Sequence, residues 1–266
     1  MVEFNFKEKY GFDDLVEIMS LLRAPGGCPW DAEQTHESIK KSFIEETYEV
    51  IEAINKKDKD LLCEELGDAM LQVVFHAQIE KEIGSFDIGD VCDGICKKLI
   101  ERHPHVFASV KVNGSDDVLD NWDTIKRKSK GQKTQGASME KIPKELPALM
   151  RAQKIQSKAK KDGFDWPEID GAYNALSSEI EELKAAVAAK DIDAITDEMG
   201  DVLFSAVNIS RFLDVDAEEA LTASNDKFIA RYLIVEKLAK ERGIDMKSST
   251  LEQLDKLWDQ AKSQTK

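Results

Sequence analysis

The chain has 266 residues, 42% of them hydrophobic and 33% charged, which is enough apolar material for one large or two modest packed domains. Its formal net charge of −15 argues against nucleic acid and anionic membranes as general partners, because both are polyanions. An anionic substrate would need a bound cation and a few well-placed Lys and Arg residues.

Membrane and export signals are missing from the sequence. The longest apolar runs, such as 70–77, fall far short of a membrane span, and residues 1–10 lack the apolar core of a signal peptide. The four cysteines do not have the spacing of a disulfide framework, which favours a reducing compartment. We therefore expect a cytoplasmic protein with no membrane and no nucleic acid as partner.

The first half of the chain predicts a series of helices. Apolar residues at helical spacing indicate helices over 12–22, 37–54 and 61–82, and one from Asp87 or Asp90 to Arg102. The polar segment 55–60 separates the second from the third, with Asp60 placed to cap the third. Because helices joined by so short a loop run antiparallel, these two should form a hairpin. Residues 24–30, rich in Pro and Gly, carry Trp30, which either stacks on a base or closes the end of a bundle.

The second half predicts the same kind of structure. Helices are expected at 148–161, 168–189, 193–213, 216–240 and 249–262, and no stretch alternates in the manner of a strand. The basic run 126–136 is typical of a mobile linker, and it lacks the aromatic residues of a nucleic-acid site. We predict an all-α protein with an N-terminal domain at 1–112, a linker at 113–142 and a C-terminal domain at 143–266.

Four acidic residues of the first predicted hairpin are paired at helical spacing. Glu46 pairs with Glu49 and Glu65 with Asp68, because residues three apart share a helix face. Antiparallel helices can bring the two pairs to one place, where four carboxylates repel one another unless a cation lies among them. Oxygen ligands without Cys or His suit Mg²⁺ or Mn²⁺. The sequence therefore predicts a metal site in this hairpin.

The same pattern occurs a second time at one constant offset, in Glu179, Glu182, Glu198 and Asp201. Basic and aromatic residues repeat downstream of it: Lys98, Arg102 and Trp122 in the first half correspond to Lys227, Arg231 and Trp258 in the second. A single acidic pair is usually a solvated helix face. Two complete quartets with these repeats indicate an internal duplication and two metal sites.

Three other interpretations compete with this one. Cys92, Cys96, His103 and His105 do not have the spacing of a usual zinc site. A di-metal oxidase is disfavoured because no His follows any of the paired glutamates by three residues. A non-catalytic nucleotide-sensing or protein-interaction module stays open, although such a module would not need intact quartets.

Nearly the whole chain resembles the MazG family of nucleoside triphosphate pyrophosphohydrolases. The resemblance rests on the motifs at 21–31, 45–49, 102–107, 163–166 and 257–262. It implies tandem MazG domains, a homodimer, and Mg²⁺-dependent hydrolysis of nucleoside triphosphates to monophosphates and pyrophosphate, as in housekeeping of the nucleotide pool. It places the catalytic metal ligands at Glu179, Glu182, Glu198 and Asp201, and the nucleotide contacts at Ala175, Leu176, Ser177, Ser178, Lys227, Phe228, Arg231 and Trp258.

The residues themselves are compatible with this chemistry. A bound cation can neutralise the triphosphate and acidify a water molecule, and a carboxylate can accept the proton. Lys227 and Arg231 could hold the leaving pyrophosphate, since Arg can bind two oxygens at once. Arg102 comes directly before a predicted helix end, whereas Arg231 lies inside a helix that continues to about residue 240. We therefore expect the C-terminal copy to carry most of the hydrolysis, with the N-terminal copy as a scaffold or a site for another nucleotide.

Overall fold

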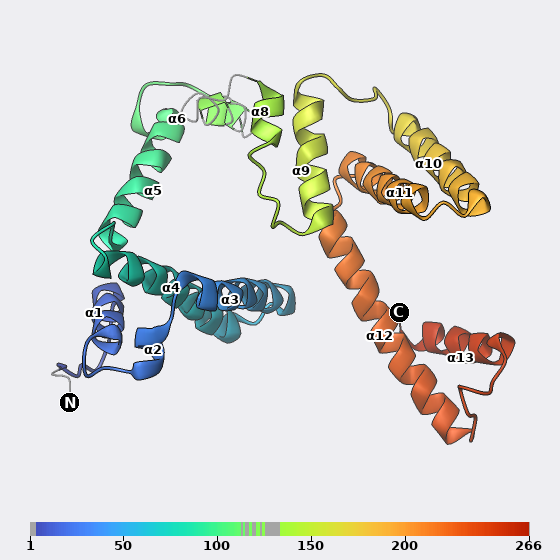
Figure 1. The fold of residues 1–266 in the computed structure, drawn as a ribbon, viewed down its shortest axis with the longest axis horizontal. Coiled ribbons are helices and arrows are strands. Elements are labelled where there is room, and N and C mark those ends of the chain that lie inside the picture. The colour runs from blue at the N-terminus through green and yellow to red at the C-terminus, as the bar shows by residue number, and fades with distance from the viewer. Residues whose placement is uncertain are drawn as a thin grey trace. The chain divides into compact units, whose positions relative to one another are not determined.

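The computed structural model describes residues 4–112, 114, 117–118, 121–122, 124–125 and 134–265, and the described residues form α-helices without a strand (Figure 1). The prediction of an all-α protein is confirmed. The basic run predicted as a linker lies outside the described residues up to position 133.

Contacts between residues divide the chain into two compact units, 1–126 and 127–266. The boundary falls inside the range predicted as a linker. Residues 134–142 of that range pack on the second unit: the short helix α8 (Gln135–Met139) contacts α9 (Ala148–Lys161), Lys158 Nζ donates to Ser138 Oγ, and Ile142 is buried.

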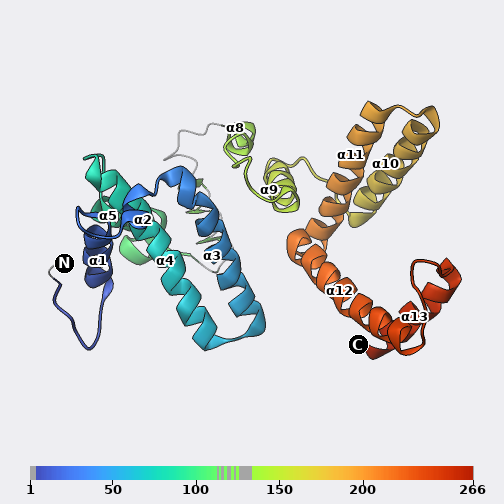
Figure 2. The same cartoon turned by 60° about the horizontal axis from the view of Figure 1, so that its bottom comes forward.

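The first unit is built around a helical hairpin. Its helices are α1 (Phe12–Arg23), α2 (Pro29–Glu33), α3 (His36–Lys56), α4 (Lys59–Glu82), α5 (Ile88–Arg102) and α6 (Pro104–Phe107). Helices α3 and α4 run side by side, and α1 packs across α4 (Figure 2). Met19, Ile39, Val74 and Phe75 form its buried core. Trp30 is 64% exposed, so it does not close the end of this bundle.

The turn inside the hairpin is tighter than the sequence pattern suggests. Lys57 adopts the left-handed conformation (φ 56°) and ends α3. Asp58 then caps α4, because its side chain accepts the backbone N–H groups of Asp60 and Leu61, at 3.1 Å each. The prediction of Asp60 as the cap is wrong, since Asp60 already lies in the first helical turn. Lys190 and Asp191 repeat the same geometry, so the duplication extends to the turn.

The second unit contains the second hairpin and a long helix that leaves it. Its longer helices after α9 are α10 (Ile169–Ala189), α11 (Ile192–Phe212), α12 (Ala217–Glu241) and α13 (Leu251–Gln264). Helices α10 and α11 form the hairpin, and α9 packs on α11 (Figure 2). Helix α13 packs on the far half of α12 through Val235, Ala239, Leu257 and Ala261 (Figure 1). We call α10 and α11 the acidic hairpin and α12 and α13 the C-terminal arm.

Among the described residues, none of the helices combines the length and the apolar character that crossing a membrane requires.

Candidate metal and nucleotide site

The acidic hairpin brings the predicted metal ligands together. Helix α10 carries Glu179 and Glu182, and α11 carries Glu198 and Asp201. One carboxylate oxygen from each of Glu179, Glu182 and Glu198 lies within 4.8 Å of the other two. Glu179 and Glu198 are half-buried and Glu182 is exposed, so the cluster opens to solvent on one side. Ser178 donates a hydrogen bond to Glu182 Oε1 at 3.0 Å.

Crowding of like charges contributes to raised pKa values in this cluster. Partial burial raises the pKa of Glu179, and the charges of Glu182 and Asp201 raise it further. The pKa of Glu198 is raised in the same way, first by burial and then by Glu182 and Asp201. Asp201 is close enough for its charge to act on Glu179 and Glu198, but it is not part of the group whose oxygens lie within 4.8 Å of one another. A divalent cation would remove the repulsion, and a set of carboxylate oxygens is the donor set that Mg²⁺ prefers.

The hairpin of the first unit holds an equivalent cluster. Oxygens of Glu46, Glu49 and Glu65 lie within 4.8 Å of one another. Burial raises the pKa of Glu46 and of Glu65, and Asp68 contributes to both increases. In the part of the chain that the structure describes, these two carboxylate groups are the clusters with metal-ligand spacing, and neither includes Cys92, Cys96, His103 or His105. Cys92 and Cys96 are exposed.

The predicted nucleotide contacts fall into two groups in the second unit. Ala175, Leu176, Ser177 and Ser178 form the turn of α10 directly before Glu179. The other four lie together on the C-terminal arm. The Phe228 and Trp258 rings are 5.1 Å apart between centroids, and the Arg231 guanidinium carbon lies 6.0 Å from the Trp258 centroid. Arg231 Nε also donates to Thr265 Oγ1 at 2.9 Å.

The structure of a single chain does not bring the C-terminal arm onto the quartet. Among the described residues, neither Lys227 nor Arg231 forms a hydrogen bond or ion pair with any of the four carboxylates. Helix α12 leaves the end of α11 and extends away from the hairpin (Figures 1 and 2). The two halves of the predicted site are therefore each assembled but lie apart.

The basic residues of the first unit have a different setting. Arg102 is the last residue of α5 and only 7% exposed, and its guanidinium carbon lies 5.1 Å from the centroid of the Trp122 ring. Only His103 separates it from Pro104, where helix α6 begins. Arg231, by contrast, lies inside α12, which continues to Glu241. This difference in helical position agrees with the sequence prediction.

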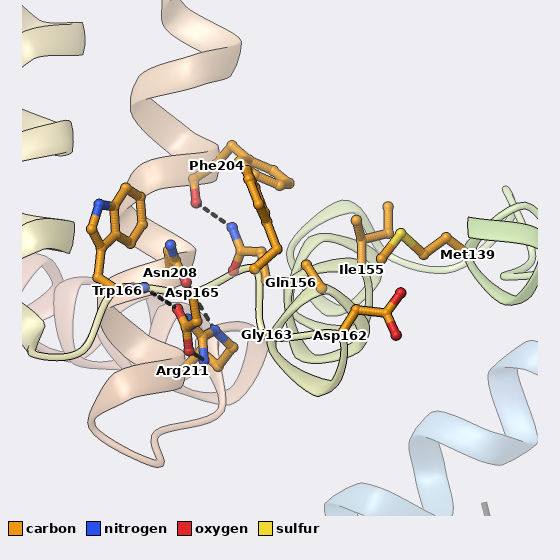
Figure 3. Close-up of a pocket in the computed structure, with 12 residues that line it drawn as sticks. Met139, Ile155, Gln156, Asp162, Gly163, Asp165, Trp166, Phe204, Asn208 and Arg211 are labelled. Atoms are coloured by element: carbon orange, nitrogen blue, oxygen red, sulfur yellow. Dashed lines mark hydrogen bonds and ion pairs between the residues drawn. The ribbon is translucent and has the colours of Figure 1, made fainter. Parts of the chain in front are cut away.

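A cavity beside the acidic hairpin was not predicted. About 590 Å³ in volume, it lies between α9, α11 and the loop 162–166 (Figure 3). Arg211 is 8% exposed and donates to both carboxylate oxygens of Asp165, at 2.9 and 2.6 Å, and its Nε donates to Asn208 Oδ1 at 2.8 Å. Gln156 Nε2 donates to the Phe204 carbonyl oxygen at 2.8 Å. The sequence does place Phe204, Asn208 and Arg211 at helical spacing after Asp201, which puts them on one face of the helix. That pattern does not identify a partner in a loop, such as Asp165.

The loop that contains Asp165 is held against α10 by close packing. Trp166 lies over Gly171, where a Cβ atom would come within 2.3 Å of the indole ring. Only a residue without a side chain allows this approach. Two consecutive residues at the end of the loop therefore fix it, Trp166 against α10 and Asp165 against α11.

The fold and the site together define a class of α-helical protein with a duplicated acidic hairpin, each copy followed by a helix with a Lys and an Arg one turn apart. The profile of the MazG nucleotide pyrophosphohydrolase domain matches residues 34–107 and 170–235, which cover the two hairpins and part or all of the helix after each. The chain belongs to the MazG family.

Several bacterial proteins are similar over nearly the whole chain. The nucleoside triphosphate pyrophosphohydrolase/pyrophosphatase MazG of Thermotoga maritima is 45% identical over 251 residues, covering 94% of this chain and 95% of that protein. The nucleoside triphosphate pyrophosphohydrolase of Escherichia coli K12 is 45% identical over 255 residues, 95% of this chain and 97% of that protein. An uncharacterised protein of Bacillus subtilis, YabN, is 46% identical over 252 residues, which make up 51% of its length.

Proposed function

We propose that this protein hydrolyses nucleoside triphosphates to nucleoside monophosphates and pyrophosphate with Mg²⁺, for which Mn²⁺ can substitute, as cytoplasmic housekeeping of the nucleotide pool. The observation that carries the proposal is the convergence of Glu179, Glu182 and Glu198 in one hairpin, where the charge of Asp201 also acts on Glu179. The names of the Thermotoga and Escherichia relatives, which match almost end to end, support the same activity.

The four carboxylates of the acidic hairpin would hold the metal ion. When bound, Mg²⁺ would neutralise part of the triphosphate charge and make a water molecule more acidic. A carboxylate that is not fully engaged as a ligand accepts that water's proton while the water oxygen attacks phosphorus. The bond between phosphorus and the oxygen that bridges the first two phosphates breaks, and the monophosphate and pyrophosphate separate. The attacked phosphorus gains the water oxygen and loses the bridging oxygen, which leaves with the other product.

The predicted nucleotide contacts have side chains suited to the rest of the substrate. Lys227 and Arg231 supply positive charge for the phosphates, and Arg can bind two oxygens at once. Phe228 and Trp258 offer ring faces on which a base can stack. The turn at 175–178 stands next to Glu179 and would border the triphosphate. Phosphoryl transfer depends mostly on positioning and charge stabilisation, so these residues suffice for the chemistry.

We further propose that the C-terminal quartet carries most of the hydrolysis. In support, Arg231 lies in mid-helix, whereas Arg102 ends its helix and is buried against Trp122. A positioning group displaced by about 1 Å can cost about a hundredfold in rate.

A matched pair of variants, Glu49→Gln and Glu182→Gln, tests the metal ligands and this ranking together. Each change keeps the side-chain volume and removes one charged ligand. Glu182→Gln should lower turnover of a triphosphate by about a hundredfold or more, and Glu49→Gln should lower it much less. Circular dichroism should show unchanged helix content in both. Near-normal turnover in Glu182→Gln would contradict the metal assignment, and equal losses would contradict the ranking.

We also propose that the chain forms a homodimer. Large apolar side chains remain exposed on both hairpins of the single chain: Ile44, Tyr48 and Leu66 in the first, and Ile180, Met199 and Leu203 in the second. Monomeric proteins seldom leave contiguous apolar faces in water, and pairing about a two-fold axis is the commonest way to cover them. Light scattering at micromolar concentration should give twice the chain mass of 29.9 kDa, and a value equal to one chain would contradict the dimer.

A further inference from the structure

The open end of the first hairpin holds two histidines and a glutamate that belong to neither acidic cluster. His36 is the first residue of α3, and His76 and Glu80 lie one turn apart near the end of α4. The Nδ1 atoms of the two rings are 2.7 Å apart, and His36 Nε2 lies 2.7 Å from Glu80 Oε1. Along α4, the nearest predicted metal ligand is Asp68, about 12 Å from His76 at 1.5 Å per residue. The group is therefore separate from the carboxylate cluster of this hairpin.

The second hairpin shows that the fold does not need ionisable side chains at this place. At the constant offset that relates the two quartets, the equivalent positions carry three aliphatic residues, Ile169, Ile209 and Leu213. Helix α10 begins at Ile169 just as α3 begins at His36, so the two hairpins correspond closely here. Partly buried polar groups cost free energy unless they find partners. Their presence in the first hairpin alone indicates a use other than packing.

The hydrogen bonds of this group direct two ring nitrogens at each other. In a neutral pair only one of the two Nδ1 atoms carries a proton, so the other presents a lone pair. Glu80 selects the tautomer of His36, because its carboxylate accepts the Nε2–H and leaves the lone pair on Nδ1. The same hydrogen bond lowers the pKa of Glu80, which keeps that carboxyl ionised. A carboxylate behind the ring is the usual way in which proteins orient a metal-binding histidine.

His76 is suited to supply a second ligand nitrogen. Burial lowers its pKa, and the charge of His36 lowers it further, so the ring is neutral at pH 7. A neutral ring can move its proton from Nδ1 to Nε2, after which both Nδ1 atoms present lone pairs to one point. Tetrahedral Zn²⁺ holds two imidazole nitrogens about 3.4 Å apart, so the pair needs to open by less than about 1 Å. The His36 side chain is 42% exposed, which gives an ion and its water ligands access.

We propose that His36 and His76 bind a divalent metal ion of the Zn²⁺ type through their Nδ1 atoms, with Glu80 as the positioning group behind His36. Water completes the coordination, because two protein ligands meet here instead of the three in each carboxylate cluster. Imidazole suits Zn²⁺, whereas Mg²⁺ prefers oxygen ligands. The site thus differs from the carboxylate clusters in the metal that it selects, and it links the start of α3 to the last turns of α4. The inference does not depend on the proposed hydrolysis.

Calorimetric titration of the metal-free, full-length protein with Zn²⁺ tests the site. The titration is run in excess Mg²⁺, which occupies the carboxylate clusters, and compares the wild type with the double variant His36→Ile and His76→Ile. This variant has the residue type that the second hairpin carries at both positions, so circular dichroism should show unchanged helix content. The wild type should bind one more Zn²⁺ per chain than the double variant. Equal numbers of bound Zn²⁺ would overturn the proposal.

The other two histidines of the chain provide a matched control. The rings of His103 and His105 are 5.6 Å apart between centroids, and His103 Nδ1 lies 2.6 Å from the Leu99 carbonyl oxygen, so it is already engaged. The variant His103→Gln with His105→Gln should bind as many Zn²⁺ ions as the wild type, and loss of one ion in this variant would contradict the assignment. Glu80→Gln should keep the number of bound ions and weaken the affinity by about 10–100-fold, as expected for a group that orients a ligand.

Nuclear magnetic resonance of the imidazole nitrogens tests the site in the wild type alone, in case the double variant does not fold. One equivalent of Zn²⁺ in excess Mg²⁺ should shift the Nδ1 resonances of His36 and His76 and leave their Nε2 atoms protonated. Imidazole resonances that stay unchanged, or that shift only in His103 and His105, would show that the pair shares a proton and does not bind the metal ion.

Discussion

Glu198 lies among other carboxylates, and its environment in the folded protein raises its pKa by disfavouring the charged form. A carboxyl whose pKa is raised on folding contributes stability below its unfolded pKa, and that contribution is lost as the pH rises through the folded pKa. At pH 7.5 and without metal, the ionised group therefore destabilises the second unit. Glu198→Gln should raise the melting temperature in EDTA by about 1–3 °C, because it removes one repelling charge.

The control for this prediction lies on the opposite helix of the same hairpin. Glu181 is exposed and pairs with Lys184 at 2.7 Å, outside the carboxylate cluster. Glu181→Gln should leave the melting temperature in EDTA nearly unchanged, since exposed ion pairs contribute little. A Glu198→Gln variant that melts below the wild type in EDTA would show that the cluster is not under electrostatic strain.

Metal binding should depend on pH with a definite sign. The raised pKa values of Glu46, Glu65, Glu179 and Glu198 mean that protons compete with a cation for these oxygens at higher pH than for ordinary carboxyls. Added Mg²⁺ should therefore raise the melting temperature more at pH 8 than at pH 5. Thermal denaturation with and without Mg²⁺ at the two pH values measures the difference, and a stabilisation that is larger at pH 5 would contradict the metal site.

Helices were the part of this structure that the sequence predicts best. Each predicted helix of the two hairpins is present, and its ends lie within about three residues of the predicted ends. Apolar spacing is a local signal, and so is a capping residue such as Asp87 before α5. The sequence predicts the wrong capping residue for α4, because Asp58 and Asp60 have the same side chain and lie within one turn of each other. Apolar spacing also identifies a helix face that avoids water, but it does not identify what covers that face. Phe43 and Ile54, two of the apolar residues in the helix predicted over 37–54, are exposed in the single chain.

For the candidate site as well, the sequence predicts the local groupings of residues and misses the contacts between distant segments. Both quartets follow from residue spacing and from one short turn, so the sequence was sufficient to group them. The Asp165–Arg211 pair joins a loop to a helix far along the chain, and no local pattern reports such a contact. The separation of Lys227 from the quartet depends on the direction in which α12 leaves the end of α11. The side chain of Gln153 helps to set that direction through its hydrogen bonds to Val215 and Ala217.

The loop 162–166 should owe its position to the ion pair between Asp165 and Arg211. Both side chains are largely buried, at 14% and 7% relative exposure, so removing the carboxylate leaves a buried guanidinium without its counter-ion. Asp165→Ala should lower the free energy of unfolding of the second unit by about 3–5 kcal/mol, as measured by urea denaturation. Glu168→Ala is the matched control, because Glu168 is exposed and its side chain makes no capping hydrogen bond. Equal effects of the two changes would show that the pair does not anchor the loop.

At the scale of the whole molecule, both halves of the duplicated chain have an acidic cluster, whereas the helices that carry the Lys and Arg pairs, α5 and α12, differ. The net charge of −15 opposes the approach of a triphosphate, so the local charge of the site must be reversed by the metal ion and by Lys227 and Arg231.

The most direct test of this account is a product-resolved assay of the purified wild-type protein on the common nucleoside triphosphates. The reaction is run with Mg²⁺ and, in parallel, with EDTA, and the products are separated by ion-exchange chromatography or followed by phosphorus NMR. We predict nucleoside monophosphate and pyrophosphate in equal amounts with Mg²⁺ and no product with EDTA. Nucleoside diphosphate with orthophosphate, or hydrolysis that proceeds unchanged in EDTA, would contradict it.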